Sequence, residues 1–371
     1  MRNGFCSIFG ALLCCLCLFS SCSDKTASTP QSENSEEWEA TKPDENVVRS
    51  QPDNSSAQLK LKLKQGDRFP LRKVVEQELI QDSLAGSTNQ ISTRLELMFA
   101  ISVIEKLEDR THLQVRYEQV KYQNRIGDQV TAFDSTRSSS NLPVSFQAYR
   151  DMVGDGFTFW IGPENQIVSV EGFTDFINRC LRNVPEAERN QVALGIEAGS
   201  GESGIANFID NSIGLLPYGG NYHPGDTWER PSHIGRPVPM LVNNTYTLKD
   251  LNKESATIDI RGEIIPSTTM TSTDEENGVR VTVKGGETLG SCTIFRETGL
   301  PQRSRVEQNI DMTVMLSGAQ QFNQRKKVTT TIEAFPMSAS AEPHRIQLGE
   351  HLSRELDNRT GGSAIRQVSG P

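Results

Sequence analysis

Hydrophobic and polar residues alternate along much of the chain after residue 58. The alternation begins at Leu59, Leu61 and Leu63, which are separated by lysines. The same period of two returns in residues 95–103, 113–117, 258–260, 279–283, 310–316 and 328–332. This period is typical of a strand with one buried face. The pattern therefore predicts a large antiparallel sheet that has one apolar and one wet face.

Turn signals separate several of these runs. Asn277-Gly278 and Gly285-Gly286 are dipeptides that favour tight turns, and we expect both to connect neighbouring strands. A further strand, turn and strand are predicted in residues 157–170.

A helical period replaces the alternation in about 172–216, between the two blocks of strands. Hydrophobic residues at helical spacing form one stripe: Phe173, Phe176, Ile177, Cys180, Leu181 and Val184. Pro185 suits the first turn of a second helix. A third candidate helix carries Ile205, Phe208, Ile209 and Ile213 on one face. We therefore expect two or three amphipathic helices that pack on the sheet.

The two strand blocks resemble each other. Residues 65–69 and 224–228 each hold a Gly-Asp pair followed by an aromatic residue two positions after the Asp. Asp67 and Asp226 are each expected to close their own backbone turn. The similarity reflects either a distant duplication or two uses of one hairpin pattern. The expected fold is mainly β (α+β), with a large antiparallel, curved sheet or a sandwich.

The N-terminus carries an export signal. Residues 5–19 are apolar over the length of a signal-peptide core, and Ser20, Ser21 and Cys22 follow. This arrangement resembles the lipobox of bacterial lipoproteins, although Phe19 stands where that family usually has Leu. The resemblance implies that Cys22 is lipidated and becomes the new N-terminus. An ordinary secretory signal and a retained membrane helix are the alternatives.

Residues 23–56 are polar, with eight acidic and three basic side chains in a protein of net charge -9. Such a segment cannot bury enough apolar surface to fold, so it predicts a disordered acidic tether. The expected organisation is a signal peptide (1–22), the tether (23–56), a β-rich body (57–337) and a flexible tail (338–371). Ser23, rather than Asp, follows Cys22, and by the lipoprotein resemblance this favours an outer-membrane anchor facing the periplasm.

The order of elements resembles an uncharacterised family of bacterial secreted proteins and lipoproteins. The resemblance is carried by the Lys-x-Gly-Asp-x-aromatic motif from Lys64 to Phe69, and by the strand-turn-strand that leads into a helix at 157–181. It covers most of 59–335 and implies no catalytic residues. The pattern is also similar to periplasmic lipoprotein carriers, which fold a curved antiparallel sheet over helices.

The chain offers little sign of catalysis. A pI near 5.3 argues against nucleic acid as a partner. Five of the seven cysteines lie in the first 22 residues, and we expect Cys180 and Cys292 to be buried free thiols rather than a disulfide. The histidines lack metal-ligand spacing, so neither a metal nor another cofactor is expected. Residues 199–204 match a dinucleotide-binding pattern but lack the strand that must precede it.

The predicted function is that of a non-enzymatic, lipid-anchored envelope protein that attaches to the membrane through its lipid and binds a protein or apolar ligand. The alternatives are a periplasmic carrier of lipids, a hydrolase of an envelope polymer and a scaffold. Any ligand site should lie between the helices and the sheet. Phe176, Ile177, Phe208 and Ile209 would line it, unless they simply fill the core.

Overall fold

The structure is a computed structural model. It describes residues 56–82, 88–137, 142–163, 165–190, 192–193, 214–217, 219–234, 240–265, 271–274, 279–316 and 321–334. The chain divides into the units Met1–Phe335 and Pro336–Pro371, and all described residues belong to the first. The predicted helix at Ile205–213, the candidate dinucleotide motif and Cys22 lie outside the described residues.

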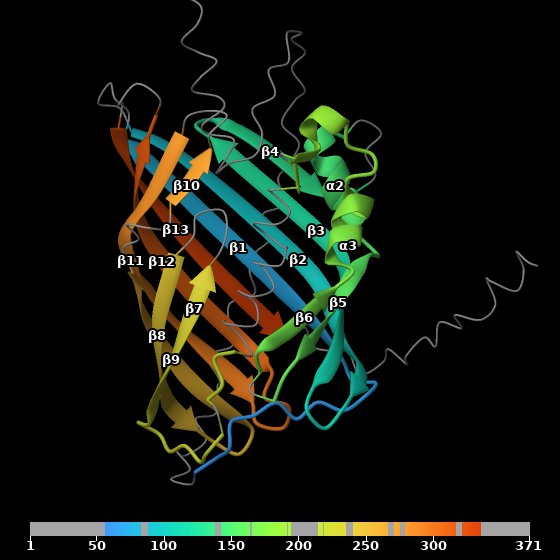
Figure 1. The fold of residues 1–371 in the computed structure, drawn as a ribbon, viewed down its shortest axis with the longest axis vertical. Coiled ribbons are helices and arrows are strands. Elements are labelled where there is room, and N and C mark those ends of the chain that lie inside the picture. Colours follow the sequence, from blue (N-terminus) through green and yellow to red (C-terminus); the bar gives the residue numbers. More distant parts are fainter. Residues whose placement is uncertain are drawn as a thin grey trace, which may run out of the picture. The chain divides into compact units, whose positions relative to one another are not determined.

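Thirteen strands form one antiparallel sheet within this described part of the chain (Figure 1). Eleven of them follow the order β6-β5-β3-β2-β1-β13-β12-β11-β9-β8-β7, while β4 pairs with β3 and β10 with β11. The first and last strands, β1 and β13, are therefore neighbours in the middle of the sheet. The bounds are β1 (Arg68–Asp82), β2 (Thr88–Lys106), β3 (Thr111–Ile126), β4 (Gln129–Asp134), β5 (Gly156–Ile161), β6 (Ile167–Glu171), β7 (Thr227–Ile234), β8 (Met240–Leu251), β9 (Ser255–Ile265), β10 (Thr271–Asp274), β11 (Val279–Phe295), β12 (Pro301–Met315) and β13 (Gln321–Ala334).

The mainly β fold with a large antiparallel sheet is confirmed, and the longer alternating runs coincide with strands β2, β3, β9, β11, β12 and β13. The prediction of a turn at Gly285-Gly286 is wrong. Both glycines lie inside β11, where the pairing with β12 shifts register between Val283 and Gly285. Gly285 has φ 139°, so the glycines permit a bulge rather than a chain reversal. Asn277-Gly278 lies outside the described residues.

The predicted strand at Leu59–Leu63 is also wrong, because residues 58–64 pair with no neighbouring strand along their length. This segment, blue at the bottom of Figure 1, crosses the ends of the strands instead. The backbone N–H of Lys62 donates to the Thr298 carbonyl at 2.9 Å. Leu59 and Leu63 are nevertheless 3% and 4% exposed. The alternation reflects burial on one side of an extended chain, which does not require a ladder partner.

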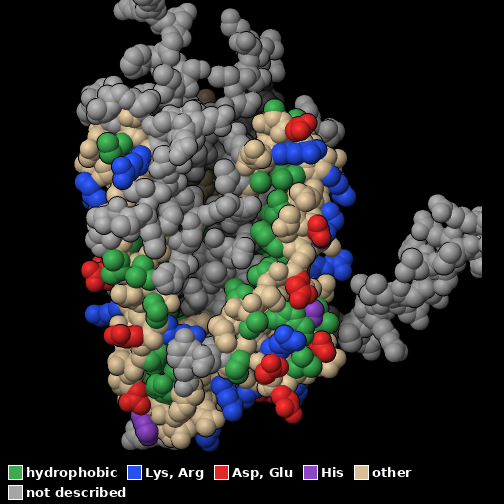
Figure 2. Space-filling view, viewed as in Figure 1, with side chains coloured by type: hydrophobic (Ala, Val, Ile, Leu, Met, Phe, Trp, Pro, Cys, Tyr) green, Lys and Arg blue, Asp and Glu red, His purple; other side chains and the backbone are tan. Residues whose placement is uncertain are grey.

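The two faces of the sheet differ sharply. The inner face, which we define by Leu95, Leu97, Phe99 and Ile101 of β2, carries the buried apolar positions. The outer face is the opposite one, with Arg94 and Glu96 on the same strand. Figure 1 shows that the sheet curls, so that β7 at one end and β5 and β6 at the other stand in front of the central strands. Figure 2 shows hydrophobic side chains along the wall near α3 and charged ones mainly at the outer margins.

Two helices pack on the inner face at one side of the sheet: α2 (Val144–Met152) and α3 (Phe173–Cys180). Helix α3 was predicted from its hydrophobic stripe, whereas no pattern predicted α2. The short helical stretch at 186–190 follows Pro185 as expected. Phe176 of α3 stacks on Tyr117 of β3, with ring centroids 5.5 Å apart. Among the residues that the structure describes, no helix combines the length and apolar character needed to cross a membrane.

The two Gly-Asp turns have the same geometry, as the sequence predicted. The Asp67 carboxylate accepts from the backbone N–H of Lys64 at 2.8 Å, and Asp226 accepts from that of His223 at 2.7 Å. Gly66 and Gly225 have φ of 88° and 99°, which favours glycine at this turn position. Each aspartate closes the entry to the first strand of its block.

Candidate functional site on the inner face of the sheet

One row of residues on the inner face is polar where the rows beside it are apolar. The pairing register aligns one residue from each of nine strands, and seven of these nine residues are polar. We call them the polar row: Asn124, Thr93, Gln77, Val328, Gln308, Thr288, Gly262, Asn244 and Arg230. Such a row is unusual on a face that is otherwise selected for burial.

The rows on both sides of it are mainly apolar. The first flanking row is Tyr122, Leu95, Val75, Thr330, Val306, Gly290, Ile260, Tyr246 and Trp228. The second is Ile126, Ile91, Leu79, Lys326, Ile310, Gly286, Ile264 and Val242. Residues of the second row belong to one hydrophobic cluster, and residues of the first row belong to two other clusters. The polar row is thus the boundary between apolar clusters on one face.

Three members of the polar row hold buried oxygens without a hydrogen-bond partner. Asn124, Thr288 and Asn244 are 3%, 1% and 5% exposed, and within the described part of the chain Asn124 Oδ1, Thr288 Oγ1 and Asn244 Oδ1 make no hydrogen bond. A buried acceptor left unmet costs about 1–3 kcal/mol. Native proteins satisfy nearly all such groups, so three unmet oxygens in one row call for an explanation. A bound ligand that donates hydrogen bonds would supply one.

Glycines surround one of these oxygens. Gly286 and Gly290 lie two residues before and after Thr288 on β11, and Gly262 is its partner on β9. A Cβ atom at Gly262 would lie 2.2 Å from Asn244 Oδ1, so the Asn244 amide extends over this glycine. Among the described residues, three of the inner-face neighbours of Thr288 therefore contribute no side chain of their own.

At the β7 end of the polar row, side-chain hydrogen bonds hold a neighbouring loop segment in place. Arg230 Nη1 donates to the Leu216 carbonyl at 2.5 Å, and Trp228 Nε1 donates to the Leu215 carbonyl at 2.7 Å. Leu215 and Leu216 are fully buried. Strand β7 thus fixes residues 215–216 against the apolar cluster that contains Tyr246 and Ile260.

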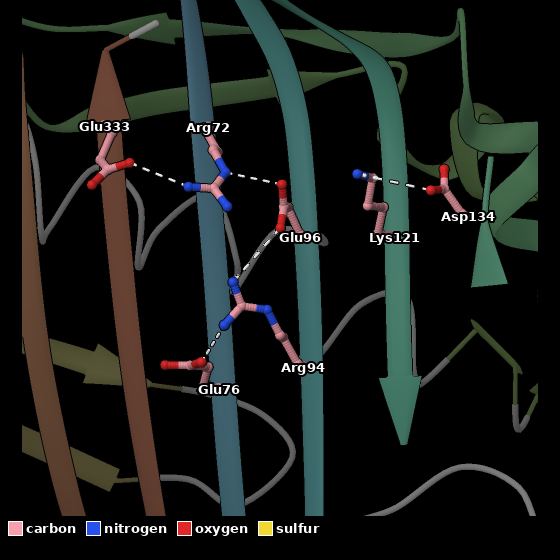
Figure 3. A network of polar contacts seen from close by, with 7 residues as sticks. All are labelled: Arg72, Glu76, Arg94, Glu96, Lys121, Asp134 and Glu333. Atoms are coloured by element: carbon pink, nitrogen blue, oxygen red, sulfur yellow. Dashed lines mark hydrogen bonds and ion pairs between the residues drawn. The ribbon is translucent and has the colours of Figure 1, made fainter. Parts of the chain in front are cut away.

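The outer face has the opposite character (Figure 3). Arg72 links β1 to both neighbouring strands, with Nε 2.9 Å from Glu96 Oε1 and Nη1 3.4 Å from Glu333 Oε2. Arg94 continues the chain of ion pairs to Glu76. Burial disfavours ionisation of Glu96, but the hydrogen bond and charge of Arg72 outweigh it and hold the pKa of this carboxyl below its ordinary value. These mutually satisfied charges mark the outer face as the water-facing side.

Lys73 is the charged side chain on the inner face of β1. It is 5% exposed, and in register it lies between Leu97 of β2 and Ile332 of β13. Removal from water lowers the pKa of its ammonium group to about 8. Cys292 and Cys180 are buried and unbridged, as predicted, and burial raises the pKa of each thiol to about 12.

The residues that the sequence suggested for a ligand site fall into two groups. Phe176 and Ile177 are 0% and 7% exposed and pack in the hydrophobic cluster between α3 and the sheet. Phe208 and Ile209 lie outside the described residues. Contact of any of these four with a ligand stays a prediction.

The polar row was missed in the sequence. Its signal is a single polar residue or glycine that interrupts an apolar alternation, as in Ile91-x-Thr93-x-Leu95 and Ile260-x-Gly262-x-Ile264. One interruption means little by itself. Its meaning emerges only when the strand register places the interruptions side by side.

The fold and the site define a β-sheet protein with a one-sided apolar face that a polar row crosses. The chain belongs to a family of unknown function, DUF6263, whose family model matches residues 108–301. This confirms the expected membership of an uncharacterised family. A comparison with curated proteins finds no match.

Several solved structures are similar at low levels. A structure concerned with lipid-protein interactions in lipovitellin matches 76% of this chain at 10% identity and a TM-score of 0.39, and this chain spans 26% of that one. An outer membrane channel from Pseudomonas putida F1 matches 74% of this chain and 97% of its own at 11% identity, with a TM-score of 0.22. OmpF of Salmonella typhi, in complex with daunomycin, matches 72% of this chain and 98% of its own at 8% identity and a TM-score of 0.17. Structural similarity at these TM-scores does not indicate a function.

Proposed function

We propose that this protein is a non-enzymatic, lipid-anchored component of the bacterial cell envelope that binds an apolar ligand on the inner face of its sheet. The observation that carries the proposal is the set of buried, unpartnered oxygens at Asn124, Thr288 and Asn244, set within an apolar face. Ligand sites combine this kind of apolar lining with a few converging polar groups.

We infer that a ligand reaches the polar row at its middle strands. Thr93, Gln77, Val328 and Gln308 are half-buried, whereas Asn124 at one end and Thr288, Asn244 and Arg230 toward the other are buried. A ligand that reaches the row through these central strands would extend along the apolar rows beside it. On the outer face, by contrast, the described central strands β1 and β2 carry paired charges.

The ligand proposal is tested with residues 23–371, the proposed mature polypeptide without its lipidated Cys22. Purified protein would be extracted with organic solvent, and the extract analysed by mass spectrometry for stoichiometric lipid. In parallel, the delipidated protein would be titrated with the neutral hydrophobic dye N-phenyl-1-naphthylamine. We expect one saturable dye site. Absence of both lipid and dye binding would contradict the proposal and leave the scaffold interpretation.

The anchor is tested separately. Cells that express the full chain would be fed an alkyne-labelled fatty acid, and incorporation would be compared in wild type, Cys22→Ala and Cys17→Ala. We expect label in wild type and Cys17→Ala and its loss in Cys22→Ala. Mass spectrometry should then find a lipidated Cys22 at the mature N-terminus. An unmodified N-terminus at another residue would contradict the anchor, and membrane fractionation would test the outer-membrane location.

A further inference from the structure

We propose that the recess around Thr288 binds the hydroxyl-bearing head of a neutral amphiphile, with its hydrocarbon on the flanking apolar rows. The Thr288 recess consists of Thr288, Asn244, Gly262, Gly286, Gly290 and Gln308. This inference rests on the proposed function, to which it adds the chemical class of the ligand.

The shape of the recess follows from its glycines. Of the four inner-face neighbours of Thr288, three are glycine, and the fourth is Gln308 on β12. Cβ atoms at Gly286 and Gly290 would lie 2.0 Å and 2.5 Å from the backbone carbonyl oxygens of β12. No side chain can therefore be accommodated at these positions without moving the strand. The close approach of β12 therefore keeps both positions beside the Thr288 hydroxyl without a side chain.

The chemistry of the recess selects its occupant. Asn244 Oδ1 can only accept a hydrogen bond, and Thr288 Oγ1 can accept or donate one. A single hydroxyl group satisfies both, because it donates to Asn244 and accepts from Thr288. A carboxylate cannot donate to Asn244, and a buried ammonium would lose its hydration without a facing charge among these residues. The recess thus favours a neutral hydroxyl over either ion.

The surroundings indicate what the hydroxyl is attached to. Tyr246, Ile260 and Val306 lie in the first flanking row, and Val242, Ile264 and Ile310 lie in the second. All six are at most 4% exposed. Hydrocarbon next to the hydroxyl would therefore contact apolar side chains on both sides. Gln308, the neighbour toward the middle of the polar row, is half-buried.

The test compares two probes that share one acyl chain. Residues 23–371, loaded with N-phenyl-1-naphthylamine, would be titrated with 1-monooleoylglycerol, which carries hydroxyls, and with methyl oleate, which carries none. Two neutral hydrogen bonds contribute roughly tenfold or more in affinity. We expect half-displacement at about tenfold lower concentration of 1-monooleoylglycerol than of methyl oleate.

Variants then assign the preference to the recess. Thr288→Val and Asn244→Leu should each reduce the difference between the probes to about twofold and leave methyl oleate unchanged. Thr293→Val is the matched control, because Thr293 lies on the outer face of the same strand, 3.3 Å from the Thr257 hydroxyl. It should keep the wild-type preference.

Each failure has a separate meaning. Equal displacement by the two probes, or a preference that survives Thr288→Val and Asn244→Leu, would overturn this inference and leave the apolar-ligand proposal standing. Failure of wild type to bind the dye, together with the absence of extractable lipid, would overturn the proposed function as well. Ligand-free Thr288→Val should unfold at the wild-type temperature or above it, because the substitution removes an unmet hydroxyl. A midpoint several degrees lower would show that the hydroxyl has a partner in the free protein and would also overturn the inference.

Discussion

The pKa of Lys73 shows how strongly the inner face is shielded from water. Its ammonium group is buried between apolar positions of β2 and β13, and its pKa falls to about 8 from an ordinary 10.5. Between these two values the unfolded chain binds a proton that the folded protein does not. The stability of the folded protein therefore rises with pH across this window.

Replacing Lys73 by Met should remove this dependence. We expect the free energy of unfolding of wild type, relative to Lys73→Met, to increase by about 2 kcal/mol between pH 7.5 and pH 9.5. Urea unfolding of both proteins at several pH values measures the difference, in which other titrating groups cancel. A difference that stays constant over this range would mean that Lys73 is solvated in the folded protein.

At the level of elements, the two Gly-Asp turns open their strand blocks in the same way. In each block the glycine N–H and the aspartate carbonyl also bond to the neighbouring strand: Gly66 and Asp67 to Val103, Gly225 and Asp226 to Leu248. The equivalence extends to a register shift after Val103 and after Leu248. The two blocks are thus repeats of one local structure.

Removal of either turn carboxylate should have a similar cost. Asp67→Ala and Asp226→Ala each leave one backbone N–H without its acceptor, so each should lower the free energy of unfolding by about 1 kcal/mol. Asp67→Asn keeps an acceptor oxygen and serves as the control, with a smaller loss. Chemical denaturation measures all three. A loss from the Asn variant equal to that of Asp67→Ala would argue against the backbone contact as the cause.

Helix α3 is joined to the sheet by a charged contact. Arg179 donates from Nε and Nη2 to the Asp155 carboxylate, at 2.6 Å and 2.8 Å. The Arg179 hydrogen bond, partly opposed by burial, holds the pKa of Asp155 below its ordinary value of 3.8. The contact therefore stabilises the folded protein above that value and is lost as pH falls through the lowered pKa.

Asp155→Asn should isolate this charge, since the amide oxygen can still accept from the Gly156 N–H. The expected loss in unfolding free energy is about 1 kcal/mol at pH 7, because Arg179 is partly exposed. The loss should shrink as the pH falls below 4, and unfolding curves across this range would measure it. An equal loss at neutral and acid pH would assign the effect to packing instead.

At the scale of the whole molecule, the two strand blocks meet through β1 and β13. Eleven residue pairs join these strands, from Leu71 with Ala334 to Gln81 with Gln324. The centre of the sheet thus forms from distant parts of the chain, which makes its assembly dependent on long-range pairing.

Truncation tests this dependence. Ending the chain after residue 320 removes β13, exposes the edges of β1 and β12 and deletes the buried Ile332. This protein should not unfold cooperatively. Ending it after residue 337 should change the unfolding midpoint by less than about 2 °C, because all described strands lie in the unit Met1–Phe335, which this truncation keeps whole. Calorimetry of both proteins provides the measurement, and a large loss in the longer one would contradict this.

The sequence by itself determined the class of fold. Long runs with a period of two predicted strands such as β2 and β12, and the stripe through Phe176 predicted α3, because burial on one side leaves a periodic trace. The turns closed by Asp67 and Asp226 were likewise predicted from the Gly-Asp pairs. The same logic failed at Leu59–Leu63, since one-sided burial also occurs in a chain that crosses strand ends. It gave no sign of α2, because in a helix of nine residues the stripe of Phe146, Tyr149 and Met152 is too short to stand out.

Only the tertiary structure decided where the polar interruptions meet. Thr288, Gly262 and Asn244 come from three strands, and their sequence spacing says nothing about which lies opposite which. A shift of two residues in one register would keep every side chain on its face and yet break the row. The register is fixed by bulges and turns distributed over the whole sheet, including the shift at Val283 and Gly285. For that reason the sequence contained the residues of the candidate site but not the site.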